Sequence, residues 1–110
     1  MTIQEKALCH VLLPQGMQNI YTVPPGRRAI IKYIRVSNVS VTQTQFKIWA
    51  RPGGDETLGE HNSITPYLIV KAGSMFSDVG FFPFEEGWEI LAEATVADRL
   101  TIWLFGAEIF

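Results

Sequence analysis

The chain has 110 residues, of which 47% are hydrophobic and 18% are charged, and its formal net charge is −2. A hydrophobic fraction of this size with so little net charge excludes an intrinsically disordered chain. The mildly acidic balance argues against a nucleic acid partner, because nonspecific binding to phosphates needs a basic patch. The single cysteine, Cys9, excludes an intrachain disulfide and fits synthesis in a reducing cytosol.

The N-terminal residues Met1–Lys6 lack the basic start and apolar run of a secretion signal. The longest apolar stretches lie near Ala29–Ile34 and Leu100–Phe110. Both are shorter than the about 20 residues that a membrane-spanning helix needs. We therefore expect no secretion signal and no membrane partner.

Short apolar clusters with a period near two follow one another along the chain, separated by Gly, Pro, Asn and Ser. This pattern is typical of strands joined by turns. The polar residues 52–62 predict a long loop, and Pro66 predicts an edge position or a bulge. In chain order, the predicted strands are Lys6–Leu13, Met17–Val23, Ala29–Asn38, Gln43–Arg51, Ser63–Lys71, Met75–Phe84, Trp88–Ala94 and Arg99–Glu108.

About eight antiparallel strands in a chain of this length favour two packed sheets, because that arrangement limits the exposed edges. The turn Pro24-Pro25-Gly26 predicts a sharp corner between the second and third strands. We predict an all-β fold, an antiparallel two-sheet β-sandwich that is jelly-roll-like, forming a single domain over residues 1–110.

Several predicted strands carry large apolar side chains on both faces, although a sandwich strand should turn a polar face to water. Trp49 stands between Lys47 and Arg51, and Leu91 stands between two glutamates. Exposed apolar clusters usually mark a partner surface. The alternative is that a bulge shifts the strand phase, or that a loop or tail covers this face within the fold. The predicted interface residues are Ile3, Trp49, Leu91, Trp103, Phe105, Ile109 and Phe110.

The sequence contains no set of residues that predicts catalysis. Cys9 and His10 are adjacent in a predicted strand, so their side chains point to opposite faces and do not form a nucleophile–base pair. Glu89 and Glu93 share a strand face, as a glycosidase carboxylate pair would, but Leu91 separates them and a solvated face is the simpler interpretation. We predict that the protein is not an enzyme and uses no cofactor.

His61 lies close in sequence to Asp55, Glu56 and Glu60, all within the polar loop. Zinc normally takes several His or Cys ligands at fixed spacings, and calcium takes a denser set of oxygens. We therefore predict a solvated loop without a metal ion.

Three stretches together resemble a known group of proteins. The first is Val23-Pro24-Pro25-Gly26 leading into Ala29–Asn38, the second is the turn and strand Glu86–Ile90, and the third is Leu100–Glu108, which closes with Gly106-Ala107-Glu108. This layout resembles the small β-sandwich virion proteins of tailed bacteriophages, which include capsid decoration proteins and minor tail components. In size and predicted fold the chain looks most like the decoration, staple or cement proteins of epsilon-type short-tailed phages.

The resemblance implies a non-enzymatic virion protein, made in the host bacterial cytoplasm. Such a protein binds the outer surface of the major capsid protein shell and stabilises the junctions between capsomers. We also expect a homo-oligomer, with a dimer as the favoured form. Apolar residues at chain ends otherwise tend to fray, so we expect Thr2–Lys6 or Ile109-Phe110 to pack on a neighbouring subunit.

Two other functions fit the same predicted fold. A carbohydrate-binding module would stack sugars on an aromatic platform, for which Trp49, Trp88, Trp103 or Tyr67 are the candidates. A minor tail or head-completion protein would differ from a decoration protein in its number of copies per particle.

Overall fold

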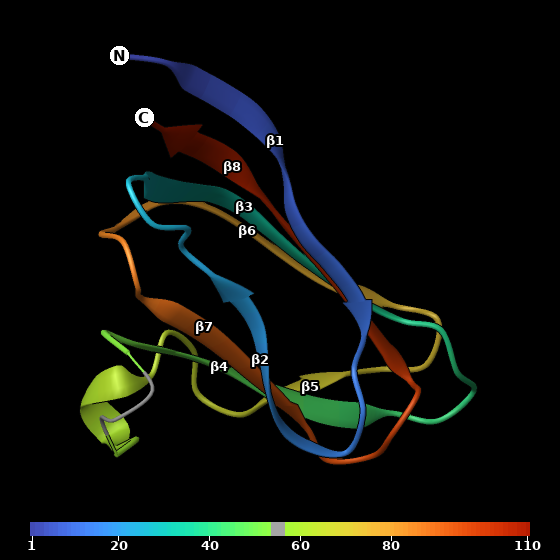
Figure 1. Ribbon diagram of the computed structural model, residues 1–110. Coiled ribbons are helices and arrows are strands. Elements are labelled where there is room, and N and C mark those ends of the chain that lie inside the picture. The colour runs from blue at the N-terminus through green and yellow to red at the C-terminus, as the bar shows by residue number, and fades with distance from the viewer. Residues whose placement is uncertain (54–56) are drawn as a thin grey trace.

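The computed structural model describes residues 1–53 and 57–110. The strands form two four-stranded antiparallel sheets that face each other, with the orders β1-β8-β3-β6 and β2-β7-β4-β5 (Figure 1). We call them the first and the second sheet. The elements are β1 (Ile3–Leu12), β2 (Gly16–Thr22), β3 (Arg28–Asn38), β4 (Thr44–Arg51), the 3₁₀ helix η1 (Glu60–Asn62), β5 (Leu68–Val70), β6 (Met75–Phe84), β7 (Glu89–Ala94) and β8 (Leu100–Ile109).

The strands pair in a nested order, β1 with β8, β2 with β7, β3 with β6 and β4 with β5. This is the order of one long hairpin rolled up into two sheets, the arrangement of a jelly roll. The predicted all-β, two-sheet sandwich is therefore confirmed. Among the described residues, no helix is long and apolar enough to cross a membrane.

The core lies between the two sheets and is filled by the side chains that alternate inward along each strand. Leu100, Ile102 and Leu104 of β8 are fully buried there. Phe46 and Ile48 of β4 belong to the same core from the second sheet and are equally buried. Because each such side chain contributes about 1.5–3 kcal/mol on burial, this layer is the main source of stability.

The predicted strand over Ser63–Lys71 is wrong in extent, because β5 contains only Leu68–Val70. Pro66 has no N–H to donate to a ladder. The Thr65 hydroxyl instead accepts a hydrogen bond from the backbone N–H of Ile48, at 3.0 Å. The preceding residues form η1 and a loop that lies against β4. The other seven strands begin and end within three residues of their predicted bounds.

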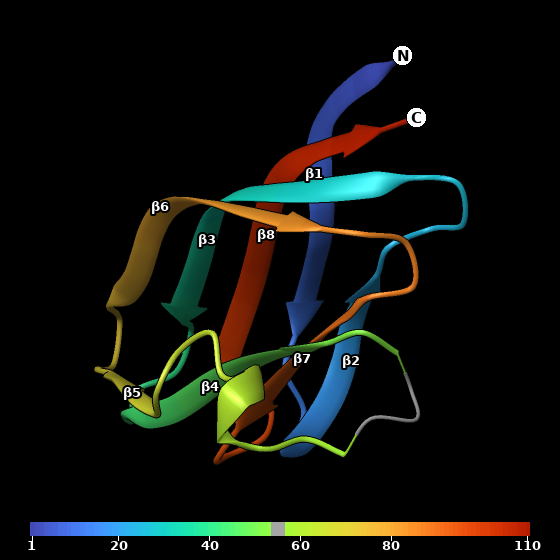
Figure 2. The same cartoon turned by 90° about the vertical axis from the view of Figure 1, so that its left-hand side faces the viewer.

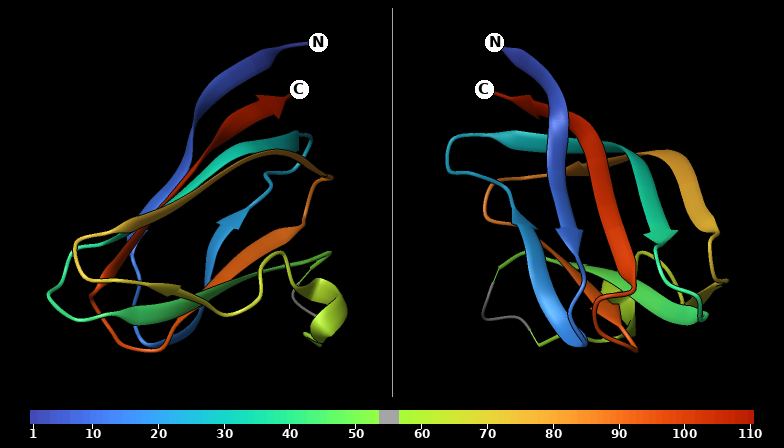
Figure 3. Two further views of the ribbon diagram at one scale, coloured as in Figure 1. Left: turned by 180° about the vertical axis from the view of Figure 1, so that it is seen from behind. Right: turned by 90° about the vertical axis from the view of Figure 1, so that its right-hand side faces the viewer.

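Strand β8 lies in the middle of the first sheet, between β1 and β3. Gly106 is required there, because a Cβ atom would collide with the carbonyl oxygen of Ile30. The start of β1 and the end of β8 pair with each other and project from the sandwich (Figures 2 and 3). Thr2 and Phe110 exchange two backbone hydrogen bonds, so each terminus holds the other.

Candidate interaction surface

The outer face of the first sheet carries a row of ring side chains. His10, Trp103, Phe105 and Tyr33, here called the aromatic row, come from β1, β8 and β3. The ring centroids of His10 and Trp103 are 4.6 Å apart, and those of Trp103 and Phe105 are 5.5 Å apart, both in stacked geometry. The ring centroids of Tyr33 and Phe105 are 5.8 Å apart, and these two rings are tilted relative to each other. Because each ring packs on the next, the row is an ordered surface.

An open hollow of about 320 Å³ lies beside the aromatic row, lined by Arg35, Ser37, Trp103 and Phe105. Arg35 is directly opposite Trp103 in the ladder, so both side chains point outward. Its Nε lies 3.1 Å from the sulfur of Met75. No carboxylate lines the hollow, and Arg35 makes no ion pair among the described residues.

Apolar side chains continue across the rest of this face. Val79 and Phe81 of β6 are 75% and 67% exposed. A second hollow, near the projecting ends, is lined in part by Ile30, Phe81 and Ile109. Ile3 pairs with Ile109 and is more than half exposed. Four of the predicted interface residues therefore share this face: Ile3, Trp103, Phe105 and Ile109.

Phe110, another predicted interface residue, lies at the end of the projecting pair of strands and is 45% exposed. The guanidinium of Arg27 lies 3.8 Å from the centre of its ring. This cation–π contact comes from the proline-glycine corner, so the C-terminal side chain is held rather than frayed.

Trp49 and Leu91, also predicted as interface residues, are only 8% and 5% exposed. They are cross-strand neighbours on the outer face of the second sheet, as the alternation predicts. The loop 57–67 folds over that face, and Ser63 forms an isolated bridge with Trp49. The expectation that these two side chains are exposed is therefore wrong. The alternative, a loop that covers the face, describes this sheet correctly.

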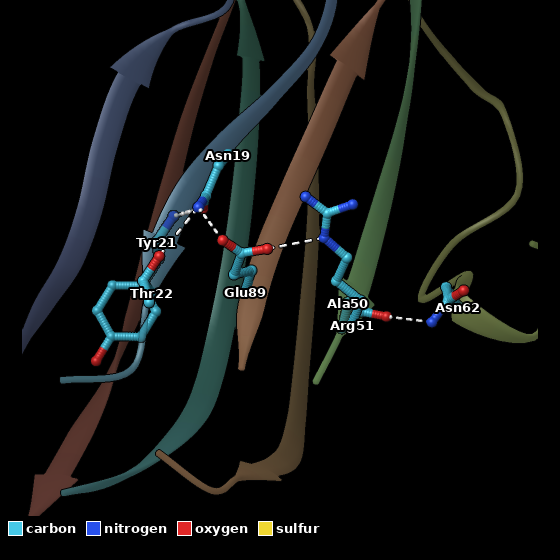
Figure 4. Close-up of polar contacts among 7 residues, drawn as sticks. All are labelled: Asn19, Tyr21, Thr22, Ala50, Arg51, Asn62 and Glu89. Atoms are coloured by element: carbon cyan, nitrogen blue, oxygen red, sulfur yellow. Dashed lines mark hydrogen bonds and ion pairs between the residues drawn. The ribbon is translucent and has the colours of Figure 1, made fainter. Parts of the chain in front are cut away.

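Polar contacts hold this covering loop in place. The Nζ atom of Lys47, a residue that is only 5% exposed, lies 4.1 Å from the centre of the Trp49 ring and 5.1 Å from that of Tyr67. It is also 3.5 Å from Oε2 of Glu60. Asn62 donates a hydrogen bond to the carbonyl oxygen of Ala50 at 2.9 Å (Figure 4). The part of this outer face around Trp49 and Lys47 is thus covered from within the chain.

Glu89 joins the three neighbouring strands of the second sheet that Figure 4 shows. It accepts hydrogen bonds from Arg51 Nε at 2.7 Å and from Asn19 Nδ2 at 3.0 Å. Glu93 has a different partner, the Tyr67 hydroxyl, from which it accepts a hydrogen bond at 2.9 Å. This hydrogen bond raises the pKa of Tyr67. The two carboxylates therefore have separate structural partners rather than forming a pair across a substrate site.

Glu108 is the most buried charged side chain of the first sheet, at 1% exposure. Its carboxylate accepts hydrogen bonds from Tyr21 at 2.5 Å and from Arg27 at 2.8 Å, and forms an ion pair with Lys6 at 2.8 Å. Burial by itself raises the pKa of this carboxyl, but the hydrogen bonds from Lys6, Tyr21 and Arg27 outweigh it and hold the pKa below the usual range. The cluster ties β1, β2 and the corner to the end of β8.

Comparisons of the sequence with models of protein families and with curated proteins give no match. The fold, however, is shared with chains from solved virus structures. A chain in the acidic stable capsid structure of Helicobacter pylori bacteriophage KHP30 is similar with a TM-score of 0.54 and 13% identity. The similarity covers 99% of each chain. The two folds are alike over almost their whole lengths.

A chain in the structure of the infectious bursal disease virus Gx strain is similar with a TM-score of 0.52 and 9% identity. The match covers 97% of this chain but only 31% of that one. At these identities the likeness concerns the fold. It agrees with the predicted sandwich fold and does not extend to epsilon-type decoration proteins in particular.

The structure also shows where Cys9, His10 and the residues considered as metal ligands lie. Cys9 packs against the core and His10 lies on the outer face, so they point apart as predicted. Burial raises the pKa of the Cys9 thiol to about 11, which makes it a poor nucleophile. Within the described parts of the chain, no three His, Cys, Asp or Glu side chains are grouped to hold a metal ion. Asp55 and Glu56, named with His61 above, lie outside the described residues.

The four aromatic residues considered for a sugar platform do not share one surface. Trp49 is covered by the loop, and Trp88 packs against the core beside Phe84. Trp103 and Tyr67 are on the outer sides of different sheets. Trp103 and Tyr67 therefore stay as two separate candidates for stacking a sugar, and Trp49 is excluded by its burial.

Sequence reasoning missed Arg35 and the buried Glu108. For Glu108 a signal was available, because it continues the inward-pointing positions of Leu100, Ile102 and Leu104 in β8. A carboxylate at such a position needs buried partners. For Arg35 no comparable signal exists, because an arginine on the outer face of a strand is ordinary.

Proposed function

We propose that the protein is a virion structural protein that binds the outer surface of a phage capsid shell as a decoration or cement protein. In this role it bridges the junctions between capsomers, as the decoration proteins of epsilon-type short-tailed phages do. The observation that carries the proposal is the match over 99% of both chains with a chain of a phage capsid structure. That chain is about as long as this one, so a small jelly roll of the same size occurs in a capsid.

The physical character of the fold supports this role. A cement protein needs a rigid body and adhesive surfaces rather than a pocket for a small molecule. Here both termini are tied by backbone hydrogen bonds, and the partners of the buried Glu108 carboxylate tie β8 to β1 and β2. The outer face of the first sheet presents ordered rings and exposed aliphatic groups, a composition typical of protein interfaces.

The projecting ends of β1 and β8 are the proposed contact with neighbouring copies. Ile3 and Phe110 are both exposed there, although they are apolar. The variant Phe110→Asp should lower any self-association, which light scattering behind size exclusion measures over a wide concentration range. Thr57→Asp, on the covering loop of the second sheet, is the control. A wild-type protein that stays monomeric at every concentration contradicts the homo-oligomer.

The shell is the direct test of the proposed function. Capsids from the encoding phage with this gene deleted are mixed with the purified protein and pelleted. We expect saturable binding and a higher temperature of genome release from the re-decorated capsids. Purified protein that stays in the supernatant, or that electron microscopy locates only on tails, contradicts the proposal.

A further inference from the structure

We propose that the hollow at Arg35 is the anchor point of the shell interface, and that it receives a carboxylate flanked by an apolar side chain from the shell subunit. This inference rests on the proposed function and names the surface and the chemistry of its partner.

The hollow is positive although the chain has a formal net charge of −2. Of its four lining residues, Arg35 is the only charged one. The nearby Lys32 is bound to Glu5 at 2.9 Å, so that pair is neutral. An arginine has five N–H donors, and the Met75 sulfur takes only one from Arg35. The complementary ligand is an acceptor that binds two donors at once, which is a carboxylate.

The rings beside Arg35 specify the second half of the ligand. Trp103 and Phe105 line the same hollow, with nearly parallel rings 5.5 Å apart. Trp, Tyr and Arg are the residue types that dominate binding energy at protein interfaces. Apart from Arg35 and the indole N–H of Trp103, only Ser37 provides a polar side-chain group there. A sugar would need several polar partners, whereas an acidic residue next to an apolar one in a protein segment matches what is present.

A second copy of this chain does not complement the hollow through the same face. The outer face offers Glu5, which is bound to Lys32, and Glu85 at the far end beside Arg28. Two copies placed face to face would therefore leave each Arg35 without an acidic partner. A face-to-face pair of copies is therefore ruled out as the occupant.

A few contacts carry most of the binding energy at a protein interface, and a charged pair beside aromatic rings is a contact of that kind. On this face that contact is Arg35 beside Trp103 and Phe105.

The experiment uses the same gene-deleted capsids and a pair of variants that change the net charge equally. Arg35→Gln removes one positive charge from the hollow, and Gln45→Glu adds one negative charge on the exposed outer side of β4, in the other sheet. We expect Arg35→Gln to weaken pelleting with capsids at least about tenfold, Arg35→Lys to weaken it less, and Gln45→Glu to leave it within about twofold. Arg35 and Gln45 are both exposed, so the Tm of all three variants should match that of the wild type.

The outcomes separate the two proposals. Wild-type binding that Arg35→Gln leaves unchanged overturns the anchor but not the decoration role. Absence of wild-type binding overturns both. Wild-type binding that is lost when the capsids are stripped of glycans assigns the hollow to a carbohydrate and overturns a protein occupant.

Discussion

Replacing Glu108 by glutamine tests the buried cluster at the end of β8. The wild-type carboxylate holds Lys6, Tyr21 and Arg27, and no solvent reaches it to any large extent. The amide of glutamine has nearly the same shape but only one acceptor oxygen, and its NH₂ group would face donors. The variant therefore removes charge and hydrogen bonds with little change in packing.

The magnitude follows from the exposure of the partners. A hydrogen bond to a charged group contributes about 1.5–3 kcal/mol. The side chains of Lys6 and Arg27 are 38% and 31% exposed, so water replaces part of what they lose. We therefore expect Glu108→Gln to lower the free energy of unfolding by about 3 kcal/mol. For a domain of this size that loss lowers Tm by at least about 12 °C.

Urea denaturation at several pH values is the assay. Because the pKa of Glu108 is lowered in the folded state, its stabilisation is present above the ordinary glutamate pKa of about 4.3 and is lost as the pH falls through the lowered value. The gap between wild type and Glu108→Gln should be full at pH 7 and should narrow below about pH 4. Glu5→Gln, which alters an exposed partner of Lys32, should change stability by less than about 1 kcal/mol. A Glu108→Gln variant as stable as wild type at pH 7 refutes this reasoning.

Three further predictions concern single positions. Trp49→Ala should lower the free energy of unfolding by about 3–5 kcal/mol in urea titrations, because the ring is buried under the covering loop, and a loss below about 1 kcal/mol contradicts that burial. Gly106→Ala should give little soluble protein, since its Cβ would strike the Ile30 carbonyl, whereas normal yield and Tm would show that β3 can move aside. Cys9 should react slowly with a thiol reagent at pH 8 and rapidly in urea, because burial raises its pKa to about 11; equal rates would mean that the thiol is accessible.

The strands could be predicted because short apolar clusters with a period near two are separated by turn residues, even though β1, β2 and β3 each contain a register shift. Met75–Phe84 is a prediction whose two ends both match the structure. The exception is the stretch before β5, where Thr65 makes a side-chain contact and Pro66 removes a backbone donor. The alternation of residues predicts which way the side chains of a strand point, but it does not predict which groups form hydrogen bonds with the strand's backbone.

The candidate surface could be predicted only in part, and Trp49 shows why. Alternation places Trp49 and Trp103 on outward faces, and both lie there. Whether an outward face is free depends on where a distant loop folds. Contacts between residues far apart in the sequence, such as Lys47 with Glu60, determine the position of that loop, and the local sequence pattern does not predict them. The position of Arg35 beside Trp103 likewise follows from the register between β3 and β8, which a single sequence specifies weakly.

The number of copies per particle tests the central proposal most directly. Under this proposal a phage encodes the chain, and quantitative mass spectrometry of the purified phage particles gives the ratio of this chain to the major shell protein. A decoration protein should be present in hundreds of copies, in a fixed ratio to the shell subunit. A ratio corresponding to one or a few rings would make it a tail or head-completion protein, and its absence from purified particles would contradict a virion role altogether.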